Sequence, residues 1–205
     1  MIGTRMVGYG GGPTPPSPHS AAHRFAFRSV AGPATDRVPA RHGAFAGVRV
    51  RPVSPADGDR IQAMVRALSL ESRRARFFAP VRELSPAQLE RMTQLVFPGV
   101  VGIVAETADA RRDLIGIAQY AADEDGPEFA VVVADAWQGR GVGRRLVGQL
   151  AALAGVAGFA VLRGFVLKSN AAMVGLAKSL GFLVSGDSDP SLYRVAKPLS
   201  RLRAG

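Results

Sequence analysis

Apolar residues recur along this chain with two different spacings, which predicts strands and helices in alternation. Short runs that are apolar or alternate apolar and polar are typical of strands, and they lie at 48–53, 99–106, 114–122, 128–134, 159–167 and 191–197. Longer stretches with apolar residues every three or four positions are typical of amphipathic helices, and they lie at 54–68, 85–95, 141–157 and 170–180. This order predicts an α/β (α+β) domain with a mixed central sheet and helices on both faces.

Two of these helices carry clear start signals. Ser85 is followed by proline and then by Gln88, which is the pattern of a capping box with proline at the first helical position. Asn170 is a good N-cap residue, and Gly181 lies where a helix over 170–180 would need its C-terminal glycine.

The N-terminal segment has a different composition. Residues 1–46 are rich in glycine, proline and arginine and lack a periodic apolar pattern, so we expect a disordered tail before a folded domain over 47–200. The tail holds five arginines against one aspartate, a composition that a transit peptide also has. We expect disorder without a targeting role.

Composition narrows the class of protein. The 205 residues are 47% hydrophobic, enough for one packed core, and include no cysteine, which excludes disulfides and thiolate metal sites. No apolar run reaches the roughly eighteen residues of a membrane helix. We therefore expect a cytoplasmic protein with no membrane partner and no metal. The net charge of +10 suits a polyanionic ligand, while the lack of a basic stripe interleaved with aromatic residues makes nucleic acid an unlikely partner.

A glycine-rich turn lies between the strand over 128–134 and the next helix. The turn reads Gln-Gly-Arg-Gly-Val-Gly over 138–143, and Arg144 and Arg145 follow it. Such a turn directs backbone N–H groups and the positive end of a helix dipole at one point, which favours a phosphate group. It lacks the lysine of a P-loop and the third glycine of a dinucleotide fingerprint, so neither of those sites is predicted.

Two motifs together resemble the Gcn5-related N-acetyltransferases (GNAT), which bind acetyl-CoA. The first is Gln-x-x-Gly-x-Gly at 138–143, and the second is Asn-x-x-Met-x-x-Leu-x-x-x-Leu-Gly-Phe at 170–182. The resemblance implies the GNAT fold, with a mixed sheet of about six to seven strands and helices on both faces. It also implies that acetyl-CoA is held by Val131, Val132, Val133, Gln138, Gly139, Arg140, Gly141, Val142, Gly143, Arg144 and Asn170.

Within that set, the resemblance gives the backbone a specific role. The strand backbone over 131–133 would pair with the pantetheine arm, and the N–H of Val133 would polarise the thioester carbonyl. The amides over 139–144 would hold the pyrophosphate.

Glu128 is the candidate general base. All three histidines lie in the tail, so a histidine-assisted nucleophile is improbable. A carboxylate could accept the proton from an acceptor amine, directly or through water. Glu128 opens the strand that ends just before the glycine turn. The alternative is that it ends the acidic loop over 123–127 and is merely solvated.

The last helix departs from many relatives that acetylate small molecules. Those proteins carry a tyrosine four residues before the closing glycine, where it can protonate the leaving thiolate, whereas this chain has Ala177. Water or Tyr193 would have to supply the proton, and Tyr193 is expected to be structural.

The segments 70–78, 128–133 and 170–182 resemble bacterial Pat-type protein lysine acetyltransferases. Phe165 departs from that pattern, where an acidic residue is expected. The resemblance implies direct acetyl transfer, in a ternary complex, to a lysine of a protein such as an acyl-CoA synthetase. A small-molecule amine acetyltransferase and a non-catalytic acyl-CoA-binding sensor are the alternatives. Arg73, Arg74 and Arg76 would either line the acceptor site or form a solvated helix end.

Overall fold

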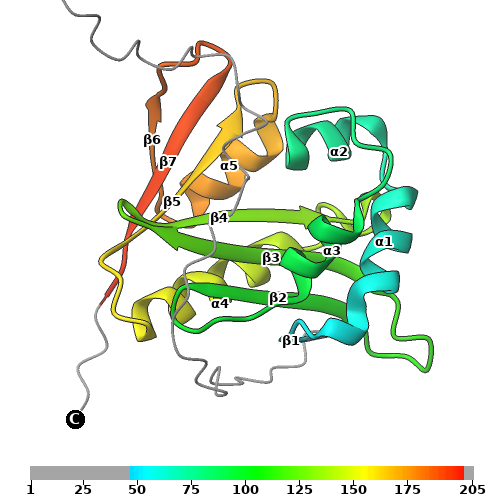
Figure 1. Ribbon diagram of the computed structural model, residues 1–205. Helices are drawn as coiled ribbons and strands as arrows, with labels where there is room; N and C mark the ends of the chain where they lie inside the picture. Colours follow the sequence, from blue (N-terminus) through cyan, green and yellow to red (C-terminus); the bar gives the residue numbers. More distant parts are fainter. Residues whose placement is uncertain (1–46, 201–205) are drawn as a thin grey trace, which may run out of the picture.

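The fold is a seven-stranded sheet in the order β1-β2-β3-β4-β5-β7-β6, seen in a computed structural model that describes residues 47–200 (Figure 1). All neighbouring strands are antiparallel except β4 and β5, which are parallel. The strands are β1 (Val48–Pro52), β2 (Val100–Thr107), β3 (Leu114–Asp123), β4 (Gly126–Val133), β5 (Val161–Leu167), β6 (Leu183–Gly186) and β7 (Leu192–Pro198). The tail expected over 1–46 lies outside the described residues.

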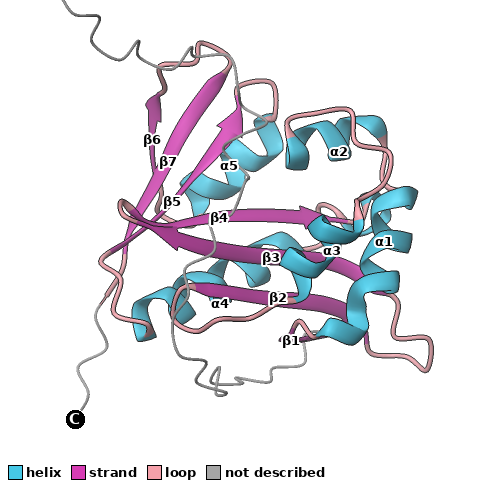
Figure 2. Cartoon of the chain, in the orientation of Figure 1, coloured by secondary structure: helices cyan, strands magenta, loops and turns pink. Residues whose placement is uncertain are grey.

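Helices cover both faces of this sheet (Figure 2). They are α1 (Gly58–Ala67), α2 (Leu70–Phe77), α3 (Pro86–Thr93), α4 (Val142–Val156) and α5 (Ala171–Ser179). Short 3-10 turns, η2 (Pro55–Asp57) and η3 (Asp135–Trp137), precede α1 and the glycine turn before α4. The predicted mixed sheet with helices on both faces is confirmed.

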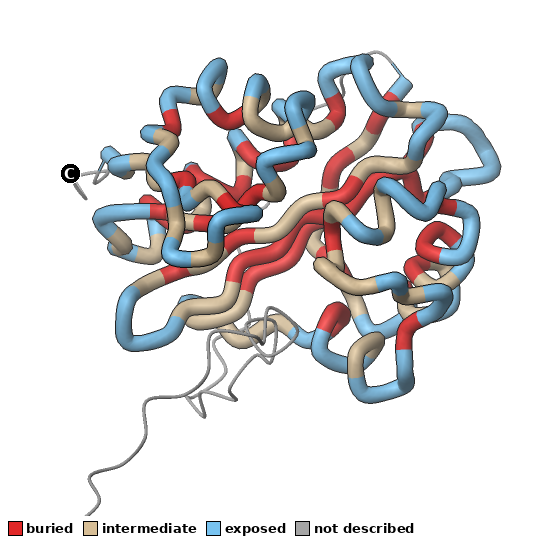
Figure 3. The backbone as a smooth tube through the Cα atoms, turned by 90° about the horizontal axis from the view of Figure 1, so that it is seen from above, coloured by how far each residue is buried: buried red, intermediate tan, exposed pale blue. Residues whose placement is uncertain are grey.

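Each face of the sheet has its own apolar core. One core joins α4 and α5 to the sheet and includes Leu146, Leu150 and Phe182, while the other joins α1 and α3 and includes Ile61 and Met92. The buried positions run along the central strands (Figure 3). Because successive side chains of a strand alternate between faces, β4 contributes to both cores.

The predicted helix signals are confirmed. The Ser85 hydroxyl accepts a hydrogen bond from the Gln88 N–H, and the Gln88 side chain accepts one from the Ser85 N–H. Asn170 Oδ1 accepts from the Met173 N–H at 2.9 Å. At the other end of α5 the Phe182 N–H donates to the Ala177 carbonyl, the bond that closes a helix through a left-handed glycine.

The sequence pattern does not predict two of the elements, and several boundaries differ by one or two residues. The edge strand β6 has only four residues, and Leu183 within it is 70% exposed, so it shows no core-facing alternation. Helix α2 is mostly polar, so it shows no apolar periodicity that would predict it. Strand β5 begins at Val161 instead of 159, because the Phe159 N–H still bonds to the Ala154 carbonyl at the end of α4.

Strands β4 and β5 separate soon after they meet. Their register has one paired position, Glu128 with Arg163, near the start of both strands. At the next position a side chain on Gly164 would lie 2.8 Å from the Phe129 ring, so glycine permits this close approach. Beyond it β5 turns away from β4 (Figure 1), which leaves one edge of β4 without a neighbouring strand in the described part of the chain.

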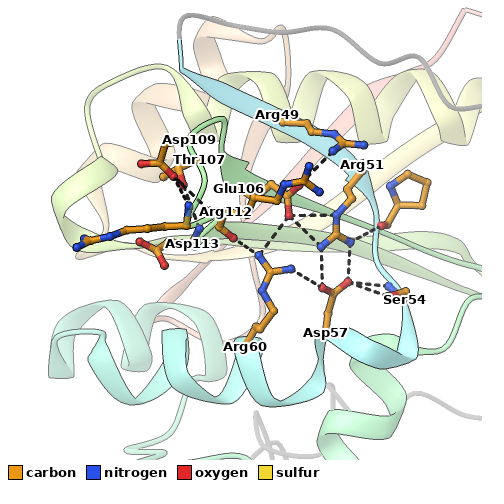
Figure 4. Close-up of polar contacts among 12 residues, drawn as sticks. Arg49, Arg51, Ser54, Asp57, Arg60, Glu106, Thr107, Asp109, Arg112 and Asp113 are labelled. Carbon is orange, nitrogen blue, oxygen red and sulfur yellow. Dashed lines mark hydrogen bonds and ion pairs between the residues drawn. The ribbon is translucent and has the colours of Figure 1, made fainter.

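A buried charge cluster joins β1, η2, α1 and β2 (Figure 4). Arg51 donates two hydrogen bonds of 2.7 Å to Asp57, and it donates a further pair to Glu106. Arg60 bonds to both carboxylates as well. Burial alone would raise the pKa of Asp57, but the hydrogen bonds from Arg51 and from Ser54 outweigh it and lower the pKa to about 2.

Candidate active site

The free edge of β4 presents the N–H groups of Val131 and Val133. The Ala134 N–H donates to the Ile115 carbonyl of β3 at 2.9 Å, and backbone groups along a strand point alternately to its two sides. The backbone N–H and C=O groups of Val132 therefore point toward β3, whereas those of Val131 and Val133 point away from it. The Val133 carbonyl accordingly accepts a hydrogen bond from a side chain, Gln138 Nε2, at 3.1 Å.

The valine side chains agree with this alternation. Val132 is buried in the core under α1 and α3, while Val131 and Val133 pack against the core under α4. The side chains of this strand thus alternate between the two cores.

The glycine turn leads into α4 through two residues with left-handed backbone. Gly139 has φ 71° and Gly141, the N-cap of α4, has φ 85°, conformations that side-chain-bearing residues rarely adopt. The first amides of α4 have no acceptor within the helix, so they point out of its N-terminus. A side chain on Gly143 would lie 3.2 Å from Leu176 of α5, so this glycine brings α4 close to α5.

These elements surround a cleft of about 1020 Å³ between β4 and β5. Helices α2 and α5 flank it at the end where the two strands separate (Figure 1). Nine of the predicted coenzyme residues line it: Val131, Val132, Val133, Gln138, Gly139, Gly141, Gly143, Arg144 and Asn170. One cavity is thus lined by a strand edge, an amide-lined turn and a helix N-terminus. This arrangement suits an extended ligand that carries a phosphate group.

Two predicted coenzyme residues are placed differently. The Arg140 guanidinium lies 5.2 Å from the centre of the Trp137 ring and is not among the residues that line the cleft. The Val142 side chain is 2% exposed and belongs to the core, so only its backbone amide could contact a ligand.

Gln138 lines the cleft, but its side chain is engaged with the protein. Besides the Val133 carbonyl, its amide group donates to Ser72 Oγ at 2.9 Å and to Asp135 Oδ1 at 3.2 Å. The side chain therefore fixes the turn against β4 and α2. Arg144 Nη donates to Ser179 Oγ at 2.9 Å and places its positive charge between α4 and α5.

Helix α2 contributes a buried arginine. Arg76 lines the cleft and is 5% exposed, so the expectation of a solvated helix end is wrong for this residue. Burial lowers the pKa of Arg76 to about 10, and the negative charge of Glu128 limits the drop. The sequence carries no local signal for this burial, because polar residues at the i, i+3, i+7 spacing of Ser69, Ser72 and Arg76 are typical of an exposed helix face.

Glu128 lies where β4 and β5 meet. The side chain of Glu128 is half-buried and is not among the residues that line the cleft. Its negative charge acts on Arg76, which does line the cleft. Its register partner Arg163 forms ion pairs with Asp123 and, at 3.2 Å, with Asp125. The arginine thus draws the neighbouring acidic loop onto β5.

A buried alanine occupies the position where many small-molecule acetyltransferases have a tyrosine. Ala177 is fully buried in the core under α5. Tyr120 is buried, its hydroxyl donates to the Pro98 carbonyl at 3.1 Å, and burial raises its pKa. Tyr193 of β7 packs against the ammonium of Lys168, which follows β5, and Tyr193 is absent from the cleft lining.

Residues 47–200 contain neither a candidate metal site nor a membrane-spanning helix. This part of the chain contains no group of three histidine, cysteine or acidic side chains that could hold a metal ion. None of the helices described here is long and apolar enough to cross a membrane.

Residues 67–182 match the acetyltransferase (GNAT) family. An acetyltransferase of Pseudomonas aeruginosa is 32% identical over 157 residues, which cover 73% of this chain and 83% of that protein. The GNAT domain of S. lividans PAT superposes with a TM-score of 0.69 at 29% identity, over 74% of this chain and 90% of that one. A putative acetyltransferase from Salmonella typhimurium, solved with its cofactor acetyl-CoA, superposes with a TM-score of 0.62 at 22% identity, over 77% and 97%. The chain therefore belongs to the GNAT family and is an acetyl-CoA-dependent N-acetyltransferase.

Proposed function

We propose that this enzyme transfers the acetyl group directly to a lysine ε-amine of a protein, with an acyl-CoA synthetase as the acceptor to test first. The observation that carries the proposal is the cleft between β4 and β5, whose amide-lined end suits the coenzyme and whose end under α2 would admit an acceptor. The likeness to the GNAT domain of S. lividans PAT supports this kind of acceptor. So does Ala177, whose buried position leaves no room for the tyrosine of many small-molecule enzymes.

The residues present fit acetyl-CoA. The N–H groups of Val131 and Val133 would pair with the pantetheine arm as an added strand does, and the amides over 139–144 would hold the pyrophosphate. Arg144 adds positive charge beside those amides. Bound acetyl-CoA supplies an activated acetyl thioester, and the Val133 N–H would donate to its carbonyl oxygen.

The acceptor end combines apolar and charged groups. Phe78, the C-cap residue of α2, and Phe165 of β5 line it and would pack on the aliphatic stem of a lysine. Leu70, which also lines the cleft, is 62% exposed and offers an apolar contact to an acceptor larger than a free amine. Glu128 would accept the proton that the acceptor ammonium must lose, directly or through a water molecule. Arg76 would place a positive charge near that carboxylate.

The test is release of free thiol from acetyl-CoA, measured with and without a purified acyl-CoA synthetase and with a panel of small amines. Release that depends on the synthetase, with acetyl found on a lysine by mass spectrometry, is the expected result. Release with amines alone would replace the protein acceptor by a small molecule. Calorimetric binding of acetyl-CoA without turnover on any acceptor would point instead to a sensor.

The base assignment has its own test with a matched control. Glu128→Gln should lower kcat by about 10²-fold or more, the usual contribution of a general base, without weakening acetyl-CoA binding. Glu124→Gln changes an exposed acid of the same hairpin and should leave kcat unchanged. Equal turnover in the Glu128 variant and the wild type would refute the assignment.

A further inference from the structure

A hydrogen-bonded cluster joins the coenzyme turn to helix α2. It consists of Asp135 in η3, Gln138 in the glycine turn, and Ser69 and Ser72 at the start of α2, and we call it the Asp135 cluster. The two serines are more than sixty residues away from Asp135 and Gln138 in the sequence, yet the four residues meet at the C-terminal end of β4.

The carboxylate of Asp135 is the centre of the cluster. Its Oδ2 accepts from the Ser69 N–H at 2.7 Å, and its Oδ1 accepts from Ser69 Oγ at 3.0 Å and Ser72 Oγ at 2.5 Å. Burial opposes ionisation, but the hydrogen bonds from Ser72 and Ser69 outweigh it, so the pKa of Asp135 lies below its ordinary value. A negative charge at this position also faces the positive end of the α2 dipole.

Gln138 extends the cluster into the coenzyme site. Its amide group donates to Ser72 Oγ, to Asp135 Oδ1 and to the Val133 carbonyl. The N–H of that same Val133 faces the cleft. One side chain in the turn therefore touches both the strand edge proposed for the coenzyme and the helix proposed for the acceptor.

The other residues of α2 give this connection a consequence. Ser69, Ser72 and Arg76 lie on one face of the helix, and Arg76 is the buried cation that interacts with Glu128. An ordinary N-cap needs only the Ser69 hydroxyl, which accepts from the Ser72 N–H at 3.1 Å. The bonds to Asp135 are additional, and they fix where the whole helix lies relative to β4.

We propose that Asp135 is a positioning residue that couples the coenzyme turn to α2, so that binding of acetyl-CoA orders the acceptor half of the cleft. The coenzyme holds the turn, Gln138 and Asp135 hold the start of α2, and the helix then places Arg76 beside Glu128. The inference goes beyond the proposed function and uses its coenzyme site, but it does not depend on the acceptor being a protein.

The first test needs no acceptor. Hydrogen exchange of the full chain is compared with and without acetyl-CoA for the wild type, Asp135→Asn and Ser72→Ala. In the wild type the coenzyme should slow exchange at the amides of α2 as well as in the glycine turn. In both variants it should protect the turn but not α2, while the calorimetric Kd for acetyl-CoA changes less than about threefold, because the phosphate-binding amides remain.

The matched control is Asp109→Asn. Asp109 also accepts bonds from a hydroxyl, Thr107 Oγ1, and from backbone N–H groups, but it lies in the β2–β3 turn away from the cleft. This variant should keep the wild-type response of α2. Protection of α2 that persists in Asp135→Asn, or that is missing in the wild type, would overturn the proposal.

The second test uses whichever acceptor supports thiol release. For Asp135→Asn the KM for that acceptor should rise about fivefold or more, with the KM for acetyl-CoA changing less than about twofold. An equal rise in both KM values would overturn the coupling and assign Asp135 to the coenzyme site alone. Failure to find any acceptor would count against the proposed function and leave the exchange result to decide this inference.

Discussion

Replacing Asp57 by asparagine tests the buried charge cluster at the opposite side of the fold from the cleft. The lowering of the Asp57 pKa from 3.8 to about 2 corresponds to about 2 kcal/mol of stability at neutral pH. Asparagine keeps one oxygen, but its NH₂ group would face donors of Arg51 or Ser54. Because removing one partner of a buried ion pair costs about 3–5 kcal/mol, we expect a loss of about 2–4 kcal/mol.

The pH dependence gives the prediction its sign. A depressed carboxyl pKa stabilises the fold above the unfolded value of 3.8, and the contribution is lost as the pH falls through about 2. The free energy of unfolding, measured by urea denaturation, should therefore differ most between wild type and Asp57→Asn at pH 5 to 7. By pH 3 the electrostatic part of the difference should shrink to about 1 kcal/mol.

A surface pair in the same chain supplies the control. Arg66 bonds to Glu83 at 2.6 Å, but both side chains are about 60% exposed, and such pairs contribute about 0–1 kcal/mol. Glu83→Gln should accordingly cost less than about 1 kcal/mol. A loss in Asp57→Asn no larger than this, or one that does not change between pH 7 and pH 3, would refute the reasoning.

Two further substitutions test how the site is built. Gly164→Ala places a Cβ 2.8 Å from the Phe129 ring where β4 and β5 meet, and it should lower the free energy of unfolding by about 1–3 kcal/mol in denaturation experiments. The control is Gly148→Ala on the exposed side of α4, which should be neutral or stabilise the fold by up to about 1 kcal/mol. Equal changes in the free energy of unfolding for the two variants would show that β5 can move away from β4 freely. Ala177→Tyr forces a large side chain into a fully buried position, so it should lower Tm by several degrees or more without raising turnover on small amines, and a gain in that turnover would contradict the structural account of this helix.

The coenzyme side of the cleft was predictable because its signals are local. Left-handed glycines in the turn, the Asn170 cap and the alternation of the valines in β4 follow from backbone geometry over a few residues. Nine of the eleven residues that the family resemblance assigned to the coenzyme line the cleft. The Arg140 and Val142 side chains were not predictable in this way, because packing onto Trp137 and into the core decides their direction.

The sequence by itself determined the order of strands and helices, the helix caps and the amide-lined turn, since each depends on neighbours along the chain. The tertiary structure alone decided the separation of β4 from β5, the burial of Arg76 beside Glu128, and the meeting of Asp135 with Ser69 and Ser72. These contacts join segments tens of residues apart, and their energies come from desolvation and from hydrogen bonds that exist only when both partners are held in place. No local periodicity encodes these contacts, so they could be found only in the tertiary structure.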